Sequence, residues 1–357
     1  MWPTPVQQPG EPSPWQRLDR RARVLTLLGL AALAVATAAT ALVSMRFGQS
    51  RAPVFYTTGS APAAIWTWDG AAYSTRPVGS NGPASNSADM AYDRARGVLV
   101  LWDHGCTNLV MGFTGGCVSH VNRTWTWDGE RWSPSGARSA PVEAGPGAML
   151  YDSRAGRVVY VNGAGRAWAW TGADWRPLAT NGAPHVVPRE SAAVASMFAA
   201  GYDEGRDLLV FALPSGTWTW DGTAWTKAAG GGIDPADARA DAHLVYDRTR
   251  GQLVYVGSRF TWTWDGAGWR PHDQPAIASG TAAYDAARGA VLLLQQDAAA
   301  CDRTGCRTAT WTWDGAAWTR VAVAHPPVLA LTRSGASLPP MAFDEGHGVM
   351  VLFASAS

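Results

Sequence analysis

The sequence predicts an all-β fold, a six-bladed β-propeller that follows one N-terminal membrane-spanning helix. Three observations predict it. A Trp-x-Trp-[Asp/Thr]-Gly motif occurs six times, a Tyr/Phe-Asp motif with a Gly and an apolar run alternates with it, and an uncharged apolar span precedes both. Small repeats rich in apolar residues, spaced by about 40 to 60 positions, are typical of propeller blades.

The tryptophan motif is expected to form the third strand of each blade and the turn after it. Alternation along a strand places both indoles on one face of the sheet, and Asp-Gly then turns the chain. Five copies carry a further Trp three residues after the Gly, and the first carries Tyr73 there, so 17 of the 20 tryptophans belong to this unit. Six equivalent copies around a ring are interpreted as core between the blades, not as a platform for sugars or bases. The copies begin at Trp66, Trp125, Trp168, Trp218, Trp262 and Trp311.

The Tyr/Phe-Asp motif is expected to end the first strand of each blade. Its Asp can accept hydrogen bonds from nearby backbone N–H groups, and its Gly can take the positive φ of a tight turn. The apolar run that follows predicts a buried second strand. The spacings Asp93/Arg96, Asp247/Arg250 and Asp285/Arg288 predict exposed ion pairs of little energetic value. The six copies begin at Tyr92, Tyr151, Tyr202, Tyr246, Tyr284 and Phe343.

The order of the motifs at the two ends predicts how the ring closes. The chain enters the repeats on a tryptophan motif and leaves them on Phe343-Asp344, and each of these is half a blade. Joined, the two halves make the sixth blade. A ring closed by strands from both ends of the chain leaves no exposed sheet edge.

These motifs resemble those of the Kelch and galactose-oxidase-like propellers over residues 54–357. The matching features are the Tyr-Asp-x-x-x-Gly turns, the apolar second strands and the Trp-x-Trp-Asp-Gly-x-x-Trp units. Kelch repeats usually carry Gly-Gly after the second strand, and this chain carries other pairs there, such as Asp103-His104. The resemblance implies the propeller fold. It does not imply the copper site of galactose oxidase, since no His and Tyr ligand set with a crosslinked Cys is identifiable.

The N-terminal region predicts a single-pass membrane protein. Residues 1–23 are expected to form a disordered cytoplasmic tail, 24–45 a transmembrane signal-anchor helix, 46–53 a linker and 54–357 the propeller. Arginines concentrated before the span favour a cytoplasmic N-terminus and an extracytoplasmic propeller in the cell membrane. In the alternative, a signal peptide is cleaved near Ala39-Thr40-Ala41 and the protein is secreted.

Four cysteines form two close pairs, Cys106 with Cys117 and Cys301 with Cys306. Each pair falls in the loop between the second and third strands of one blade, the first and the fifth. Short loops closed in this way predict two disulfides in an oxidising compartment. The alternative is a zinc site, for which four ligands would have to converge from distant blades. No metal and no cofactor is therefore expected.

The net charge and the motifs limit the classes of function that fit this chain. The net charge is +1 and no basic stripe runs through the propeller, which argues against nucleic-acid binding. No nucleophile elbow, His-Glu-x-x-His or phosphate-binding glycine loop occurs. The sequence therefore favours a protein without catalytic activity. Carboxylate pairs assembled from distant loops are not visible in sequence, so an enzyme stays open as the alternative.

Function is expected at the rim that carries the long loops. The turns after the first and third strands share one rim of the ring, here called the turn rim. The loops after the second strands and between blades share the other, the long-loop rim, and variable loops on a rigid scaffold are the usual binding surface. Candidate binding residues on this rim are Asp103, His104, His120, Arg123, His185, Arg189, Glu190, Asp302 and Arg303.

Two functions follow from this rim. The first is a binding or interaction module for a protein or an envelope glycan. The alternative is an extracytoplasmic carbohydrate-active hydrolase or lyase with acidic residues at the channel mouth. His104 and His120 are interpreted as exposed loop histidines, and His243 as a packed or hydrogen-bonded residue near the channel. Polar residues before the fourth blade, Asp237 among them, are also expected at this rim.

Overall fold

The computed structural model describes most of the propeller. The described residues are 63–78, 82–83, 87–110, 116–120, 122–141, 147–184, 198–239, 241–275, 277, 280–301, 306–329, 331–332, 335–336 and 338–355. The predicted tail, membrane-spanning helix and linker, residues 1–53, lie outside them. Within the described part of the chain, no helix is long and apolar enough to cross a membrane.

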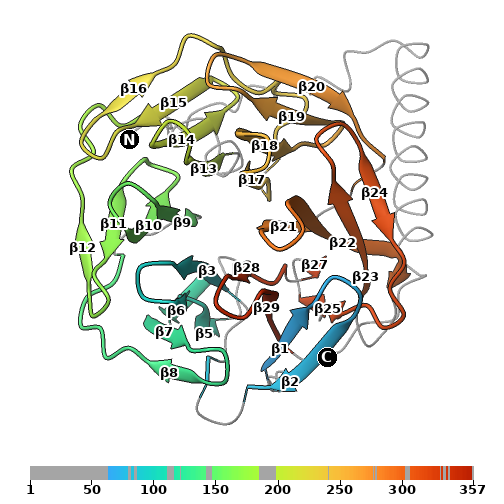
Figure 1. Ribbon diagram of the computed structural model, residues 1–357. Helices are drawn as coiled ribbons and strands as arrows, with labels where there is room; N and C mark the ends of the chain where they lie inside the picture. Colours follow the sequence, from blue (N-terminus) through green and yellow to red (C-terminus); the bar gives the residue numbers. More distant parts are fainter. Residues whose placement is uncertain are drawn as a thin grey trace, which may run out of the picture. The chain divides into compact units, whose positions relative to one another are not determined.

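Six antiparallel sheets surround a central channel, as predicted, and we number them as blades in chain order (Figure 1). Blade 1 contains β3 (Ala88–Asp93), β4 (Val98–Asp103), β7 (Arg123–Trp127) and β8 (Trp132–Pro134). Blade 2 contains β9 (Gly147–Asp152), β10 (Arg157–Asn162), β11 (Ala167–Trp170) and β12 (Trp175–Pro177). Blade 3 contains β13 (Ala199–Asp203), β14 (Leu208–Leu213), β15 (Gly216–Trp220) and β16 (Trp225–Lys227).

Blades 4 and 5 continue the ring. Blade 4 contains β17 (Leu244–Asp247), β18 (Gln252–Val256), β19 (Phe260–Trp264) and β20 (Trp269–Asp273). Blade 5 contains β21 (Gly280–Asp285), β22 (Ala290–Cys301), β23 (Cys306–Trp313) and β24 (Trp318–Val321), and β25 (Val328–Leu329) pairs with β23.

Strands from both ends of the repeats build blade 6, which confirms the predicted closure. Its sheet order is β2 (Tyr73–Pro77), β1 (Ala63–Trp68), β29 (Val349–Ser355) and β28 (Met341–Asp344). In β1 and β29, Ile65 lies opposite Phe353 in antiparallel register. Figure 1 shows this blade as blue strands beside red ones.

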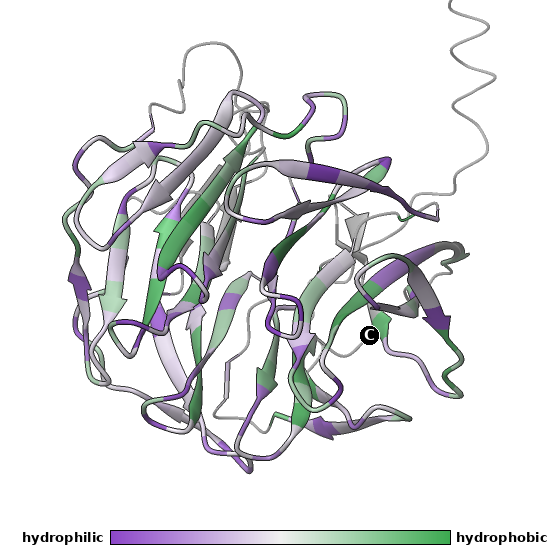
Figure 2. Cartoon of the chain, turned by 45° about the horizontal axis from the view of Figure 1, so that its top comes forward, coloured by the Kyte–Doolittle hydropathy of each residue, from purple (hydrophilic) through white to green (hydrophobic). Residues whose placement is uncertain are grey.

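The core lies between the blades, in six apolar clusters. Each cluster joins two neighbouring blades and contains both indoles of one Trp-x-Trp pair; Trp168 and Trp170, for example, pack with Val100 and Trp102 of blade 1. The structural interpretation of the tryptophans is therefore confirmed. In Figure 2 the hydrophobic colour concentrates on the strands, whereas the turns are largely hydrophilic.

The turns of the Tyr/Phe-Asp motifs correct one prediction. The side chain of Asp93 is fully buried, and Arg96 Nη1 donates to its Oδ2 at 2.8 Å. Arg96 Nη2 also donates to the carbonyl oxygen of Thr171 in the next blade at 2.7 Å. The prediction of exposed pairs is wrong, because these pairs hold a buried carboxylate and link adjacent blades. Asp247 and Asp285 are buried and paired in the same way.

Additional hairpins rise from the long-loop rim. β5 (Cys106–Val110) pairs with β6 (Gly116–His120) in blade 1, and β26 (Leu331–Thr332) pairs with β27 (Gly335–Ala336). The β22–β23 hairpin extends beyond the sheet and ends in the Cys301–Cys306 disulfide, which is confirmed with an S–S distance of 2.06 Å. The side chains of Cys106 and Cys117 lie outside the described part, so their disulfide stays a prediction.

Candidate functional site

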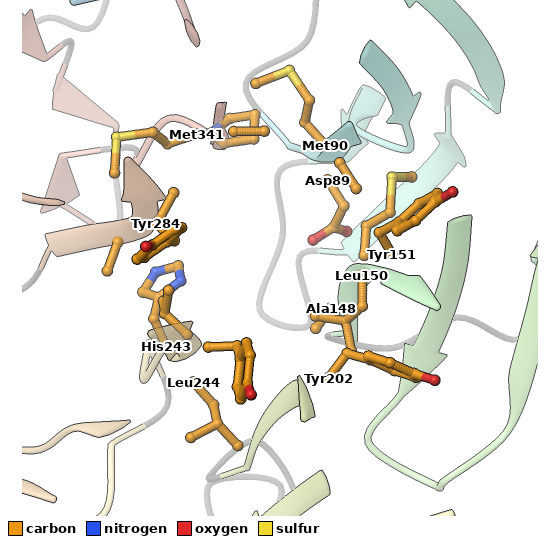
Figure 3. Close-up of a pocket in the computed structure, with 18 of the residues that line it drawn as sticks. Asp89, Met90, Ala148, Leu150, Tyr151, Tyr202, His243, Leu244, Tyr284 and Met341 are labelled. Carbon is orange, nitrogen blue, oxygen red and sulfur yellow. The ribbon is translucent and has the colours of Figure 1, made fainter. Parts of the chain in front are cut away.

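A cavity of about 390 Å³ runs along the central channel. Its wall consists mainly of the first strands of all six blades, β3, β9, β13, β17, β21 and β28 (Figure 1). Apolar side chains such as Met90, Leu244 and Met341 line much of it, and Asp89 and His243 add polar groups (Figure 3). The cavity has two mouths that differ in chemistry.

A closed ring of four ion pairs lies at the mouth on the turn rim. Arg94 contacts Glu204 at 2.6 Å and Glu345 at 2.8 Å. Arg248 contacts the same two carboxylates, Glu204 at 3.0 Å and Glu345 at 2.7 Å. Desolvation raises the pKa of Glu204, although its hydrogen bond and charge interaction with Arg94 oppose that shift. Each charge therefore has two opposite neighbours, and the ring crosses this end of the channel.

The sequence contains a signal for this ring that the two repeated motifs do not include. The four residues occupy one repeated place, directly after the Asp of the Tyr/Phe-Asp motif. Blades 1 to 6 carry Arg94, Ser153, Glu204, Arg248, Ala286 and Glu345 there. The order basic, small, acidic occurs twice around the ring, so a two-fold charge pattern is superimposed on the six repeats.

The mouth on the long-loop rim holds a histidine–aspartate pair. His104 Nε2 lies 2.9 Å from Asp89 Oδ2, and the His104 ring lies against Trp102 with 4.5 Å between ring centroids. His104 thus has a partner and is half-buried, not the exposed loop histidine that was expected. Because Asp89 faces the channel, the pair joins the channel wall to the first long loop.

His243 stands across the cavity from Asp89 (Figure 3). Desolvation lowers the pKa of its imidazole, and the negative charges of Asp241 and Asp89 oppose this shift only partly. A hydrogen bond with the backbone of Gly280 ties the ring to the next blade. The expectation of a hydrogen-bonded residue at the channel is therefore confirmed. Because the imidazole N–H donates to this backbone, a neutral His243 leaves a ligand one acceptor nitrogen.

The carboxylates that line the cavity all have basic partners. They are Asp89, Glu204 and Glu345, paired with His104 in the first case and with the two arginines of the ring in the others. Across the described residues, no group of three His, Cys, Asp or Glu side chains is placed to hold a metal ion. The described cavity therefore combines apolar walls with carboxylates that are paired with basic side chains.

The predicted rim residues differ in burial, and several of them lie outside the described part of the chain. Arg123 is exposed at the start of β7, and His104 is half-buried at the channel mouth. Asp103 is buried at the end of β4 and accepts a long hydrogen bond from the backbone N–H of Gly105. His120 lies in β6, but its side chain is outside the described part. The other predicted residues lie outside the described ranges altogether: His185, Arg189, Glu190, Asp302 and Arg303.

Asp237 does not lie free on the rim as expected. It is fully buried, and its carboxylate accepts hydrogen bonds from the backbone N–H of Phe260 at 3.3 Å and from the indole N–H of Trp262. It therefore anchors the loop before blade 4 to the third strand of that blade. The sequence could not distinguish this buried carboxylate from exposed ones, because its partners lie more than twenty residues away.

Comparisons with known proteins are confined to the fold. No protein-family model matches the chain, and no curated protein matches it. The chain is similar to the SapL1 lectin in complex with alpha methyl fucoside, at 14% identity over 72% of this chain and 85% of that one, with a TM-score of 0.42.

Two further solved structures are similarly distant. One is a GH74 xyloglucanase from Xanthomonas campestris, at 16% identity over 83% of this chain and 49% of that one, with a TM-score of 0.45. The other is a protein from Dyadobacter fermentans, at 13% identity over 85% and 97%, with a TM-score of 0.46. At such distances these likenesses transfer no function to this chain.

Proposed function

We propose that this protein is a non-catalytic binding module that recognises a protein or an envelope glycan through its long-loop rim. One observation carries the proposal, the difference between the two channel mouths. The mouth on the turn rim is crossed by four ion pairs, whereas the mouth on the long-loop rim presents Asp89, His104 and His243 beneath elaborated hairpins. A ligand that enters the cavity from the long-loop rim meets polar groups with apolar walls behind them, as in typical binding sites.

We further propose that the propeller is of Kelch-like type and is held outside the cell membrane by the span at residues 24–45. The Cys301–Cys306 disulfide supports an oxidising compartment, because disulfides persist there and are rare in the cytosol. The arginines before the span support a cytoplasmic N-terminus.

A carbohydrate-active enzyme is the weaker candidate. Glycosidases generally need two carboxyl groups roughly 5 to 10 Å apart, one of them free to act as an acid. In the described cavity each carboxylate already faces a basic side chain. No observation in the described residues therefore favours the enzyme over the binding module.

The test measures binding of a soluble form that starts near residue 52 to envelope fractions of the source cell, with and without prior protease digestion. Binding lost on digestion identifies a protein partner, and binding that survives identifies a glycan or lipid. Arg123→Glu and Arg307→Glu reverse two exposed charges on the long-loop rim, and we expect each to weaken binding by about fivefold or more.

Arg131→Glu is the matched control, because Arg131 is exposed on the turn rim. We expect this variant to bind like the wild type. Equal loss of binding in all three variants would contradict the assignment of the long-loop rim. Release of new reducing ends from the envelope material would instead support the enzyme.

A further inference from the structure

Basic side chains close five of the six boundaries between blades on the turn rim. Each stands three residues after the Asp of a Tyr/Phe-Asp motif and contacts the carboxylate of that Asp at 2.7 to 2.9 Å. Three also donate to a backbone carbonyl of the next blade, Arg96 to Thr171, Arg206 to Asp265 and Arg250 to Gly289. The five residues are Arg96, Arg206, Arg250, Arg288 and His347.

Each of these side chains lies over a glycine of the next blade. The glycine belongs to the turn after the Trp-x-Trp strand, and a Cβ placed on it would come within 1.7 to 2.2 Å of the basic side chain. The basic group therefore fills a slot between the buried carboxylate and the bare glycine, and for Arg96 and Arg206 the turn carbonyl forms a third wall. The five glycines are Gly172, Gly266, Gly315, Gly70 and Gly129.

The sixth slot, between blades 2 and 3, has no such side chain. Ala155 stands where the other blades carry Arg or His, and a Cβ on the facing Gly222 would meet nothing within 4 Å. A cavity of about 230 Å³ occupies the place, lined by Asp152, Ala155 and Gly222 among others. We call this cavity the vacant slot.

The Asp152 carboxylate accepts hydrogen bonds from the backbone N–H of Ala155 at 3.0 Å and from the side chain of Tyr202, but among the described residues no basic side chain approaches it as closely as in the filled slots. Asp152 is buried, and Arg157 Nε lies 3.4 Å from its Oδ2. The carbonyl oxygen of Asp221 accepts a hydrogen bond from Arg154 Nη1, also at 3.4 Å. Both distances exceed those in the filled slots, so two nearby arginines approach the site without replacing the missing group.

A strained residue adds a second carboxylate to the vacant slot. Asp207 has a φ of 56°, at a turn position where the other five blades carry Gly with φ between 62° and 67°. A non-glycine residue in this left-handed region is uncommon, and Asp is among the residue types that adopt it most readily. Three aspartates and two arginines therefore line the slot, and its net charge is negative.

We propose that the vacant slot binds a guanidinium group, supplied either by a free guanidino compound or by an arginine side chain of a partner. The same chain fills the equivalent slot with a guanidinium in four other blades, so the walls match its planar fork and its charge. The slot lies on the turn rim. It is thus separate from the long-loop rim and does not depend on the function proposed for that surface.

The first test is a ligand-observed NMR titration of the full-length chain with methylguanidinium. We expect saturable binding at one site. Ala155→Arg supplies the missing group from within, and we expect it to weaken binding by about tenfold or more. Ala316→Arg adds the same charge at an exposed turn residue of blade 5 and is the matched control, expected to bind like the wild type.

The reciprocal variant opens a second slot. Arg250→Ala removes the basic side chain that pairs with Asp247 and covers Gly315, and we expect the number of bound methylguanidinium ions to rise from one to two. If Arg250→Ala does not fold, the wild type and Ala155→Arg still decide the outcome. Lack of saturable binding by the wild type, or unchanged binding by Ala155→Arg, would overturn the proposal.

Two more probes define the ligand. Methylammonium carries the same charge without the planar fork, and equal binding of this ion would also overturn the proposal. Acetyl-arginine N-methylamide carries the group on a peptide backbone. Binding as tight as that of methylguanidinium supports an arginine side chain as the source, and much weaker binding supports a free guanidino compound.

Discussion

The indole N–H of Trp175 in blade 2 donates to Thr124 Oγ1 of blade 1 at 2.8 Å, and both side chains are buried. Trp269 and Trp318 repeat this contact with Thr217 and Thr261 of the preceding blades, at 2.7 Å each. The third aromatic of the tryptophan motif therefore hydrogen-bonds across a blade boundary in five of the six copies, as well as filling the core.

Blade 6 shows what happens where the threonine is missing. Ile65 occupies the place of Thr124, and the indole N–H of Trp132, which packs against it, has no hydrogen-bond partner among the described residues. Trp132 therefore contributes to that boundary by apolar packing and not by an indole hydrogen bond. The hydrogen bond is thus an addition to the packing, with a measurable contribution of its own.

Thr124→Val should lower the free energy of unfolding by about 1 to 3 kcal/mol, because it leaves the buried indole N–H of Trp175 without an acceptor while keeping the shape. Chemical denaturation measures this change. Thr226→Val alters an exposed side chain on a fourth strand and is the control. Equal effects of the two substitutions would show that the cost comes from the valine and not from the lost hydrogen bond.

Gly172→Ala and Gly222→Ala form a matched pair on the turn rim. Both glycines have strongly positive φ, 93° and 102°, so each alanine has a backbone cost of about 1 to 2 kcal/mol. At Gly172 the new Cβ also meets the side chain of Arg96, whereas at Gly222 it enters the vacant slot. We therefore expect Gly172→Ala to lower the melting temperature more than Gly222→Ala. The reverse order would argue against a filled slot at Gly172.

The sequence predicted the fold because the repeats determine it. Strand order, closure of blade 6 and the core role of the tryptophans all follow from period and alternation. The ion-pair ring and the vacant slot were missed because they arise where equivalent positions differ. Arg94 and Glu204 are 110 residues apart, and only the ring geometry brings them together. Spacing along the chain carries no information on such contacts across the channel.

Glu204→Gln tests the electrostatics of the ion-pair ring. Desolvation raises the pKa of Glu204 above its usual 4.5. The native state therefore binds a proton at the Glu204 carboxylate more readily than the unfolded chain does. The group's contribution to stability is therefore largest below pH 4.5 and decreases as the pH rises through the raised pKa. Glu204→Gln removes this titration and keeps the size of the side chain.

Urea unfolding of both proteins between about pH 4 and pH 7 measures the effect. We expect the wild type to lose stability relative to Glu204→Gln as the pH rises. Glu130→Gln, at an exposed carboxyl on the same rim, controls for the loss of a surface charge. A stability difference that stays constant across this range would contradict the raised pKa.

The two cysteine pairs make separate predictions. Peptide mapping by mass spectrometry without reduction should recover Cys301–Cys306, and also Cys106–Cys117, whose backbones lie in the paired strands β5 and β6. Free thiols at Cys106 and Cys117 would refute the second bridge alone.

Replacing both Cys301 and Cys306 by serine opens the loop that this disulfide closes, whose ends are five residues apart in the sequence. The unfolded chain then gains entropy, so the substitution should lower the free energy of unfolding by about 2 kcal/mol. This bridge lies at the tip of the hairpin, beyond the blade 5 core, so the serine variant should keep the propeller fold, which circular dichroism before unfolding verifies.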